Sequence, residues 1–121
     1  MLSSKEVDAI GQILNNTWGR GDRKVDYHLQ NDLFLLRYQT IVHFASERSL
    51  QVQAPQLAEE SGQIMKDVLA DLKKQFKEMT GNTLKLKERF DRDSIELISA
   101  TSVNPRKIAY YRRKIEFLVE N

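Results

Sequence analysis

The residues of this chain best suited to chemistry are basic, and they crowd into one stretch near the C-terminus. Residues 106–114 hold five Lys or Arg and two adjacent tyrosines. Arginine and lysine neutralise phosphates, and tyrosine rings stack on bases. We therefore expect a surface that contacts nucleic acid or another polyanion. Its expected members are Lys85, Lys87, Arg89, Arg106, Lys107, Tyr110, Arg112 and Lys114.

The direction of these side chains follows from strand alternation. If the stretch is a strand, Arg112 and Lys114 point one way and Arg113 the other. The apolar residues that follow share the face of Arg113, so that face is expected to meet the core. Arg112 and Lys114 would then face outward beside Tyr110 and contact phosphates. The alternative interpretation is a charged solvent face that keeps a sheet edge from aggregating.

No group of residues has the spacing of a catalytic or metal site. The two histidines, His28 and His43, fall in expected strands and have neither helical ligand spacing nor a carboxylate cluster. Asp67 and Asp71 stack at helical spacing beside lysines, as an ion-paired solvent face does. There is no cysteine and no glycine-rich phosphate loop. The sequence therefore predicts a protein that is not an enzyme, with no catalytic residue, metal or cofactor.

The charge of the chain is distributed unevenly, although the net charge is only +2. Residues 73–114 hold twelve Lys or Arg against five Asp or Glu, and the remainder holds seven against twelve. Such asymmetry favours either an anionic partner or self-association of unlike ends. Besides the polyanion-binding module, we therefore expect a different class of function as the alternative: an assembly subunit of a homo-oligomer with no nucleic-acid role.

Length and composition indicate one globular α+β domain over residues 1–121. Hydrophobic residues make up 40% and charged residues 30% of the chain, which is typical of a folded, well-solvated protein. The absence of cysteine favours a reducing compartment. No apolar run approaches ~18 residues and the N-terminus lacks a signal-peptide core, so the expected location is the cytoplasm of a cell or of a host, with no membrane partner.

The clearest structural signal is a long helix over Pro55–Thr80. Pro55 suits a first helical position, and Gly81 suits the left-handed residue after a helix. At ~1.5 Å per residue the helix would be roughly 39 Å long, so we expect it to lie across a sheet and run past its edge. The apolar stripe that would face the core is formed by Leu57, Ser61, Ile64, Val68, Leu72, Phe76 and Met79, widened by Met65 and Leu69.

A shorter helix is expected over Ser3–Trp18. Ser3 and Glu6 have the spacing of a capping box, in which each side chain satisfies a free amide of the first turn. Trp18, the only tryptophan, would anchor this helix to the sheet.

The rest of the chain reads as strands and turns. Residues 31–32, 46–49 and 91–93 are expected turns, and 106–120 is ambiguous. A helix capped by Asn104 and Pro105 would fit it, but its aromatic and β-branched residues favour a strand in a hairpin. We therefore expect an antiparallel sheet of five to six strands packed with two helices, or three if the last segment is helical. The expected strands are residues 25–30, 34–44, 50–53, 84–90, 95–103 and 106–120.

Overall fold

A computed structural model describes residues 1–15, 22–98 and 107–120 of the chain. In these residues two helices and four strands follow one another, and the strands form one antiparallel sheet of order β1-β2-β4-β3. The elements are α1 (Ser4–Leu14), β1 (Lys24–Gln30), β2 (Leu33–Phe44), α2 (Glu47–Thr80), β3 (Lys85–Ile98) and β4 (Lys107–Glu120). The α+β class and the antiparallel sheet are confirmed, whereas the expected five to six strands are reduced to four.

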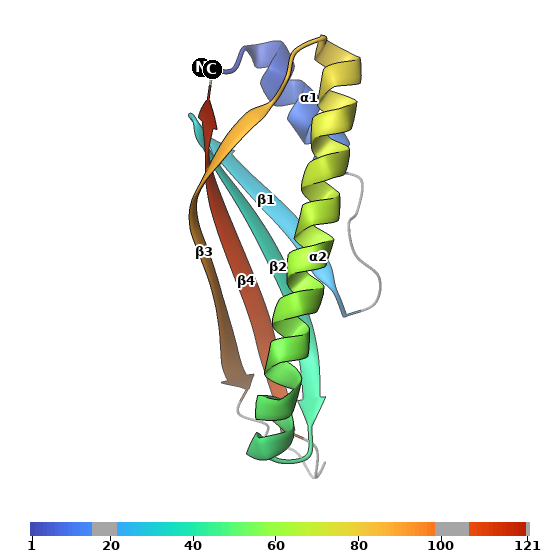
Figure 1. Cartoon of the computed structure of the whole chain (residues 1–121), viewed down its shortest axis with the longest axis vertical. Helices are drawn as coiled ribbons and strands as arrows, with labels where there is room; N and C mark the ends of the chain where they lie inside the picture. The colour runs from blue at the N-terminus through green and yellow to red at the C-terminus, as the bar shows by residue number, and fades with distance from the viewer. Residues whose placement is uncertain (16–21, 99–106, 121) are drawn as a thin grey trace.

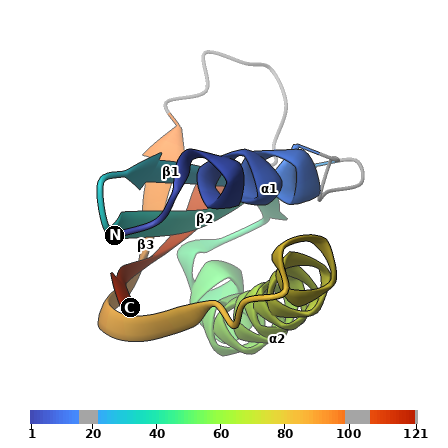
Figure 2. The same cartoon turned by 90° about the horizontal axis from the view of Figure 1, so that it is seen from above.

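Both helices lie on the same face of the sheet, and the core lies between them and the strands (Figures 1 and 2). Inward-pointing residues of β2 and β4 pack against one another: Phe34 contacts its direct partner Phe117, and Tyr38 contacts Tyr111 diagonally, with ring centroids 6.0 and 6.1 Å apart. No helix of the described residues is long and apolar enough to cross a membrane.

The long helix α2 begins earlier than its sequence pattern indicates. Ser46 and Ser49 form a reciprocal capping box, so the chain turns directly into a helix at Glu47. The expected strand 50–53 is therefore wrong, and Pro55 lies inside the helix instead of at its start. A proline there removes one backbone hydrogen bond and so destabilises the helix locally. Burial of Leu50 and the cap at Ser46 offset this loss of stability.

The core-facing stripe of α2 follows the predicted helical period, but four of its nine predicted members are not fully buried. Ser61, Met65, Val68, Leu72 and Phe76 are buried, Leu57, Ile64 and Leu69 are only partly buried, and Met79 is exposed. Gly81 ends the helix with φ of 75°, as expected of a left-handed C-terminal residue. With 34 residues the helix is roughly 51 Å long, and it runs along the strands, not across them (Figure 1).

The N-terminal helix α1 has the predicted capping box between Ser3 and Glu6. The carboxylate of Glu6 accepts the backbone N–H of Ser3, and these hydrogen bonds lower the pKa of Glu6. Trp18 lies outside the described residues, as do Asn104, Pro105 and Arg106, so the expectations placed on them are not addressed.

The C-terminal hairpin resolves the ambiguous segment. Residues 107–120 form strand β4, so the helical alternative is wrong. The expected turn at 91–93 is also wrong, because β3 continues through it for 14 residues. Pairing of β3 with the long strand β4 supplies hydrogen bonds along this whole segment and overrides the local turn preference of Asp91 and Asp93.

The long strand β3 is accommodated by a β-bulge. The register with β4 shifts between Glu88 and Phe90, which leaves Arg89 as the extra residue. An extra residue reverses the alternation of every side chain beyond it. Phe90, which unbroken alternation would place on the same face as Leu86, therefore lies on the opposite face.

Candidate functional site

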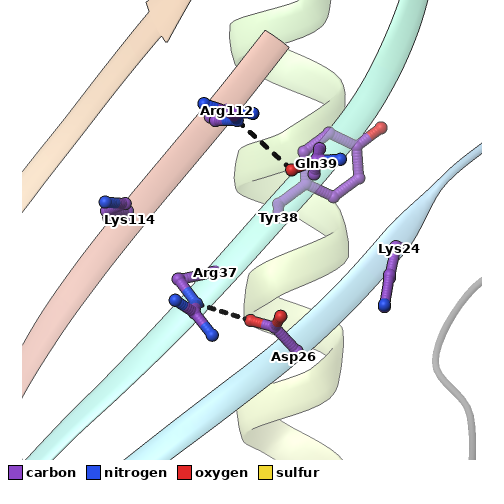
Figure 3. A pocket seen from close by; sticks show the side chains of 7 residues that line it. All are labelled: Lys24, Asp26, Arg37, Tyr38, Gln39, Arg112 and Lys114. Atoms are coloured by element: carbon purple, nitrogen blue, oxygen red, sulfur yellow. Dashed lines mark hydrogen bonds and ion pairs between the residues drawn. The ribbon is translucent and has the colours of Figure 1, made fainter. Parts of the chain in front are cut away.

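The helices leave the second face of the sheet uncovered, and we call this the open face. Strand alternation separates it cleanly in β2 and β4, where buried residues alternate with half-buried or exposed ones. In Figure 3 the open face is toward the viewer and α2 lies behind the strands. Between Leu35 and Ile41 of β2, every side chain that the register places on the open face of the four strands is polar or charged.

Five cationic side chains cross the middle of the open face, and we call them the basic band. In one cross-strand row Arg37 of β2 pairs with Lys114 of β4, which pairs with Arg92 of β3. In the next row Lys24 of β1 and Arg112 of β4 flank Gln39 of β2. The basic band therefore comprises Lys24, Arg37, Arg92, Arg112 and Lys114, and it draws on all four strands.

A hollow of about 270 Å³ lies over four of the five cations of the basic band, all except Arg92 (Figure 3). Cations of three different strands converge on it, with a carboxylate and an amide among them. Its lining is formed by Lys24, Asp26, Arg37, Tyr38, Gln39, Arg112 and Lys114.

Two arginines of the basic band are held in place by neighbours on the open face. Arg112 donates from Nε to Gln39 Oε1 at 3.2 Å, forms an ion pair with Glu96, and lies 5.2 Å from the centroid of the Tyr110 ring. Arg37 donates from Nε to Asp26 Oδ1 at 2.7 Å. These contacts fix both guanidinium groups while leaving donor atoms available to a ligand.

The row Arg37–Lys114–Arg92 places three like charges directly opposite one another across neighbouring strands. Like charges in such positions destabilise a sheet. Asp26 pairs with Arg37, but Lys114 and Arg92 form no ion pair with the described residues. An anion bound over this row would relieve the repulsion.

The structure brings most of the predicted surface residues together. Tyr110, Arg112 and Lys114 lie on the open face, with Arg113 on the helix-covered face as expected. Lys85 and Lys87 also lie on the open face, toward the end where Leu118 and Glu120 of β4 are found.

Three of the predicted residues differ from the expectation in position. Arg89 is the bulge residue, and its guanidinium reaches Glu116 at 3.5 Å. Lys107 pairs with Phe44 and therefore belongs to the helix-covered face, where it is exposed at the end of the sheet. Arg106 lies outside the described residues.

Sequence reasoning missed three members of the basic band: Lys24, Arg37 and Arg92. Arg37 and Lys24 do sit at the polar positions of alternating strands, which is a usable signal. What the sequence does not show is that β2 pairs with β4, some 70 residues away, so that Arg37 adjoins Lys114. Arg92 was assigned to a turn and therefore given no face.

A second polar cluster lies under α2, on the helix-covered face. Arg113 forms a two-pronged ion pair with Asp91, and its Nη1 donates to the carbonyl of Ala58 at 2.7 Å. The hydroxyl of Tyr111 donates to Asp93 at 3.2 Å and lies 3.1 Å from the buried Ser61 Oγ. This cluster links α2 to β4 and β3.

The electrostatics of this cluster do not prepare a group for acid–base work at neutral pH. Burial, reinforced by the charge of Asp93, raises the pKa of Tyr111 above its ordinary value, so the hydroxyl is a weaker acid than in water. The carboxylate of Asp91 raises the pKa of Arg113 and keeps it charged. Among the described residues no three His, Cys, Asp or Glu side chains gather as metal ligands would.

Comparison with protein-family models, with curated proteins and with solved structures finds no match for this chain. The fold and the site together define an α+β protein with one helix-covered and one open sheet face, the open face carrying a basic band.

Proposed function

We propose that this chain is a non-enzymatic binding module whose open face contacts nucleic acid or another polyanion. The observation that carries the proposal is the basic band: five cations from four strands lie on an uncovered sheet face. Two of them, Arg92 and Lys114, lack an ion-pair partner among the described residues. With no cysteine in the chain, we place its work in a reducing compartment, the cytoplasm of a cell or host.

The spacing of the cations favours an extended anion over a small one. Neighbouring strands lie ~4.8 Å apart and alternate residues along a strand ~6.7 Å apart, so the band covers an area that no single small anion could contact. A phosphate backbone offers repeated charges at the same length scale and displaces counterions as it binds. The hollow opens to solvent between cations of three strands, which suits a ligand that passes over the surface.

The test is the double variant Arg92→Ala with Lys114→Ala, measured by fluorescence anisotropy against mixed-sequence oligonucleotides over a salt series. Loss of two phosphate contacts should flatten the plot of log K against log salt by about 1.4 for single strands and about 1.8 for duplex DNA. The affinity should fall for all sequences equally, because phosphate contacts carry no sequence information. The thermal midpoint should not fall, since exposed charges contribute little stability and their loss removes the like-charge repulsion of the row.

A matched control is the double variant Lys73→Ala with Lys74→Ala. These exposed lysines lie on α2, on the other side of the sheet from the basic band, and their loss removes the same net charge. If the control weakens binding as much as the test variant, the attraction is diffuse and the basic band is not the site. If the parent chain binds no DNA, RNA or other polyanion at ~50 mM salt, the proposal is wrong.

The second candidate function is an assembly subunit of a homo-oligomer. The observation that favours it is the apolar character of one end of the open face, where Leu33, Phe90 and Leu118 are exposed. Exposed apolar groups on an uncovered sheet suit a contact with a second copy. Molar mass in solution, measured with and without an oligonucleotide, separates the two functions: an assembly subunit is oligomeric alone and shows no salt-dependent binding.

A further inference from the structure

We propose that the polyanion is a single-stranded nucleic acid, and that Phe90 and Tyr110 are the platforms on which its bases stack. This inference rests on the proposed function and narrows it to one ligand class. Its basis is that the two aromatic rings lie on the open face at opposite ends of the basic band.

Phe90 is on the open face only because of the bulge in β3. Without the extra residue Arg89, alternation would direct Phe90 to the helix-covered face. Instead it pairs with Glu116 and is 44% exposed. Bulges commonly redirect a side chain of a strand. Exposure of an apolar ring to water is unfavourable, so covering the Phe90 ring with a ligand would be favourable.

Tyr110 marks the other end of the basic band, beside Ile41 of β2 and Glu96 of β3. The guanidinium of Arg112 lies 5.2 Å from the centroid of its ring and holds it in place. A ring with a neighbouring cation suits a nucleotide, because a base stacks on the ring while the cation meets a phosphate.

The two rings enclose the basic band along the direction of β4. Phe90 lies beside Glu116, six positions from Tyr110, which corresponds to ~20 Å along a strand. Between them pass the rows of Lys114 and of Arg112. A short run of unpaired nucleotides laid along β4 would therefore meet an aromatic ring, two rows of cations and a second ring in turn.

A duplex fits this surface less well. Sequence reading in the major groove needs a helix or a two-stranded ribbon that projects into it, yet α1 and α2 both pack on the other face of the sheet (Figures 1 and 2) and the basic band lies in the sheet's centre. In a duplex the faces of the bases are stacked on one another and closed to Phe90 and Tyr110. Only an unpaired strand offers free base faces together with phosphates.

The experiment compares one mixed-sequence 12-nucleotide strand with its own duplex, at the same low salt, for the parent chain and for three variants. We expect the parent to bind the single strand at least tenfold more tightly than the duplex. Phe90→Ala and Tyr110→Ala should each weaken single-strand binding about tenfold and leave duplex binding unchanged. The control is Leu97→Ala, which removes an apolar side chain that is even more exposed (58%) from the opposite face of β3 and should change neither.

The outcomes separate the inference from the function on which it rests. Equal or tighter binding of the duplex, or full single-strand affinity in both Phe90→Ala and Tyr110→Ala, overturns the inference while the basic-band proposal stands. Loss of affinity in Leu97→Ala equal to that in Phe90→Ala also overturns it, because general apolar adhesion then explains the effect. Failure of the parent to bind either ligand refutes the proposed function itself.

Discussion

The ion pair between Arg113 and Asp91 offers the sharpest test of how the long helix is held on the sheet. Arg113 is the one cation on the helix-covered face of the middle of β4, and its side chain is only 19% exposed. Its Nε and Nη2 donate to the two Asp91 oxygens at 2.9 and 2.7 Å. Its Nη1 reaches the Ala58 carbonyl and the Ser61 hydroxyl, so one guanidinium joins β4, β3 and α2.

The perturbation is Arg113→Met, which keeps the length and the apolar stem of the side chain and removes the guanidinium. An exposed ion pair contributes about 0.2–1 kcal/mol, and breaking a fully buried one costs about 3–5 kcal/mol. With Asp91 30% exposed, this pair lies between those limits, and the Ala58 carbonyl also loses its donor. We expect a loss of about 2 kcal/mol, or roughly 8 °C in thermal midpoint for a chain of this length.

The assay is a double-mutant cycle of Arg113→Met and Asp91→Asn by chemical denaturation. Because each single variant already breaks the ion pair, the double variant should be less destabilised than the sum, by about 1 kcal/mol. The control is Arg112→Met, the neighbouring arginine on the open face, whose side chain is twice as exposed. It should cost less than about 1 kcal/mol.

Two results would refute this reasoning. If Arg113→Met is no more destabilising than Arg112→Met, the guanidinium does not secure α2. If the two single variants are additive, the two-pronged contact with Asp91 contributes no coupling, and the loss arises from packing and from the hydrogen bonds of Arg113 to α2.

Three further variants or conditions test other parts of the fold. Phe76→Ala should cost about 3–5 kcal/mol, because the ring is fully buried, and a thermal midpoint within a degree or two of the parent would contradict its burial. Burial raises the pKa of the Tyr38 and Tyr111 hydroxyls. The folding stability that depends on their neutral form is therefore present below pH ~10 and is lost as the pH rises through the raised pKa values. In an absorbance titration, Tyr38→Phe and Tyr111→Phe should each remove a late tyrosinate component, and loss of an early one would be inconsistent with burial. Pro55→Ala should stabilise the chain by about 1–2 kcal/mol, since it restores a backbone N–H inside α2. An unchanged or lower denaturation midpoint would show that this N–H forms no stabilising helical hydrogen bond.

Much of the fold could be predicted from the sequence because it depends on interactions between residues close together in the chain. The 3.6-residue period placed Val68, Leu72 and Phe76 toward the core, and both capping at Ser3 and the left-handed Gly81 followed from residue type. The two-residue period of 107–120 separated Arg113 from its outward-facing neighbours. Each of these depends on geometry within a few residues of chain.

The errors arose where a distant partner overrode a local preference. Asp91 and Asp93 favour a turn by themselves, but fourteen residues of pairing with β4 keep β3 extended. The error at Pro55 is different, because the competing signal is also local: the reciprocal cap of Ser46 and Ser49 begins the helix two turns earlier.

For the candidate site, the sequence by itself determined the residue types and, within a strand, which of them share a face. Arg112 and Lys114 were therefore assigned to the outer surface correctly, because alternation is a property of an extended backbone alone. Only the tertiary structure decided that Arg37 and Arg92 stand beside Lys114, since strand order and register depend on contacts between segments far apart in the chain. It also decided the face of Phe90, because a single bulge residue reverses the alternation, and nothing in the neighbouring sequence marks where that residue is inserted.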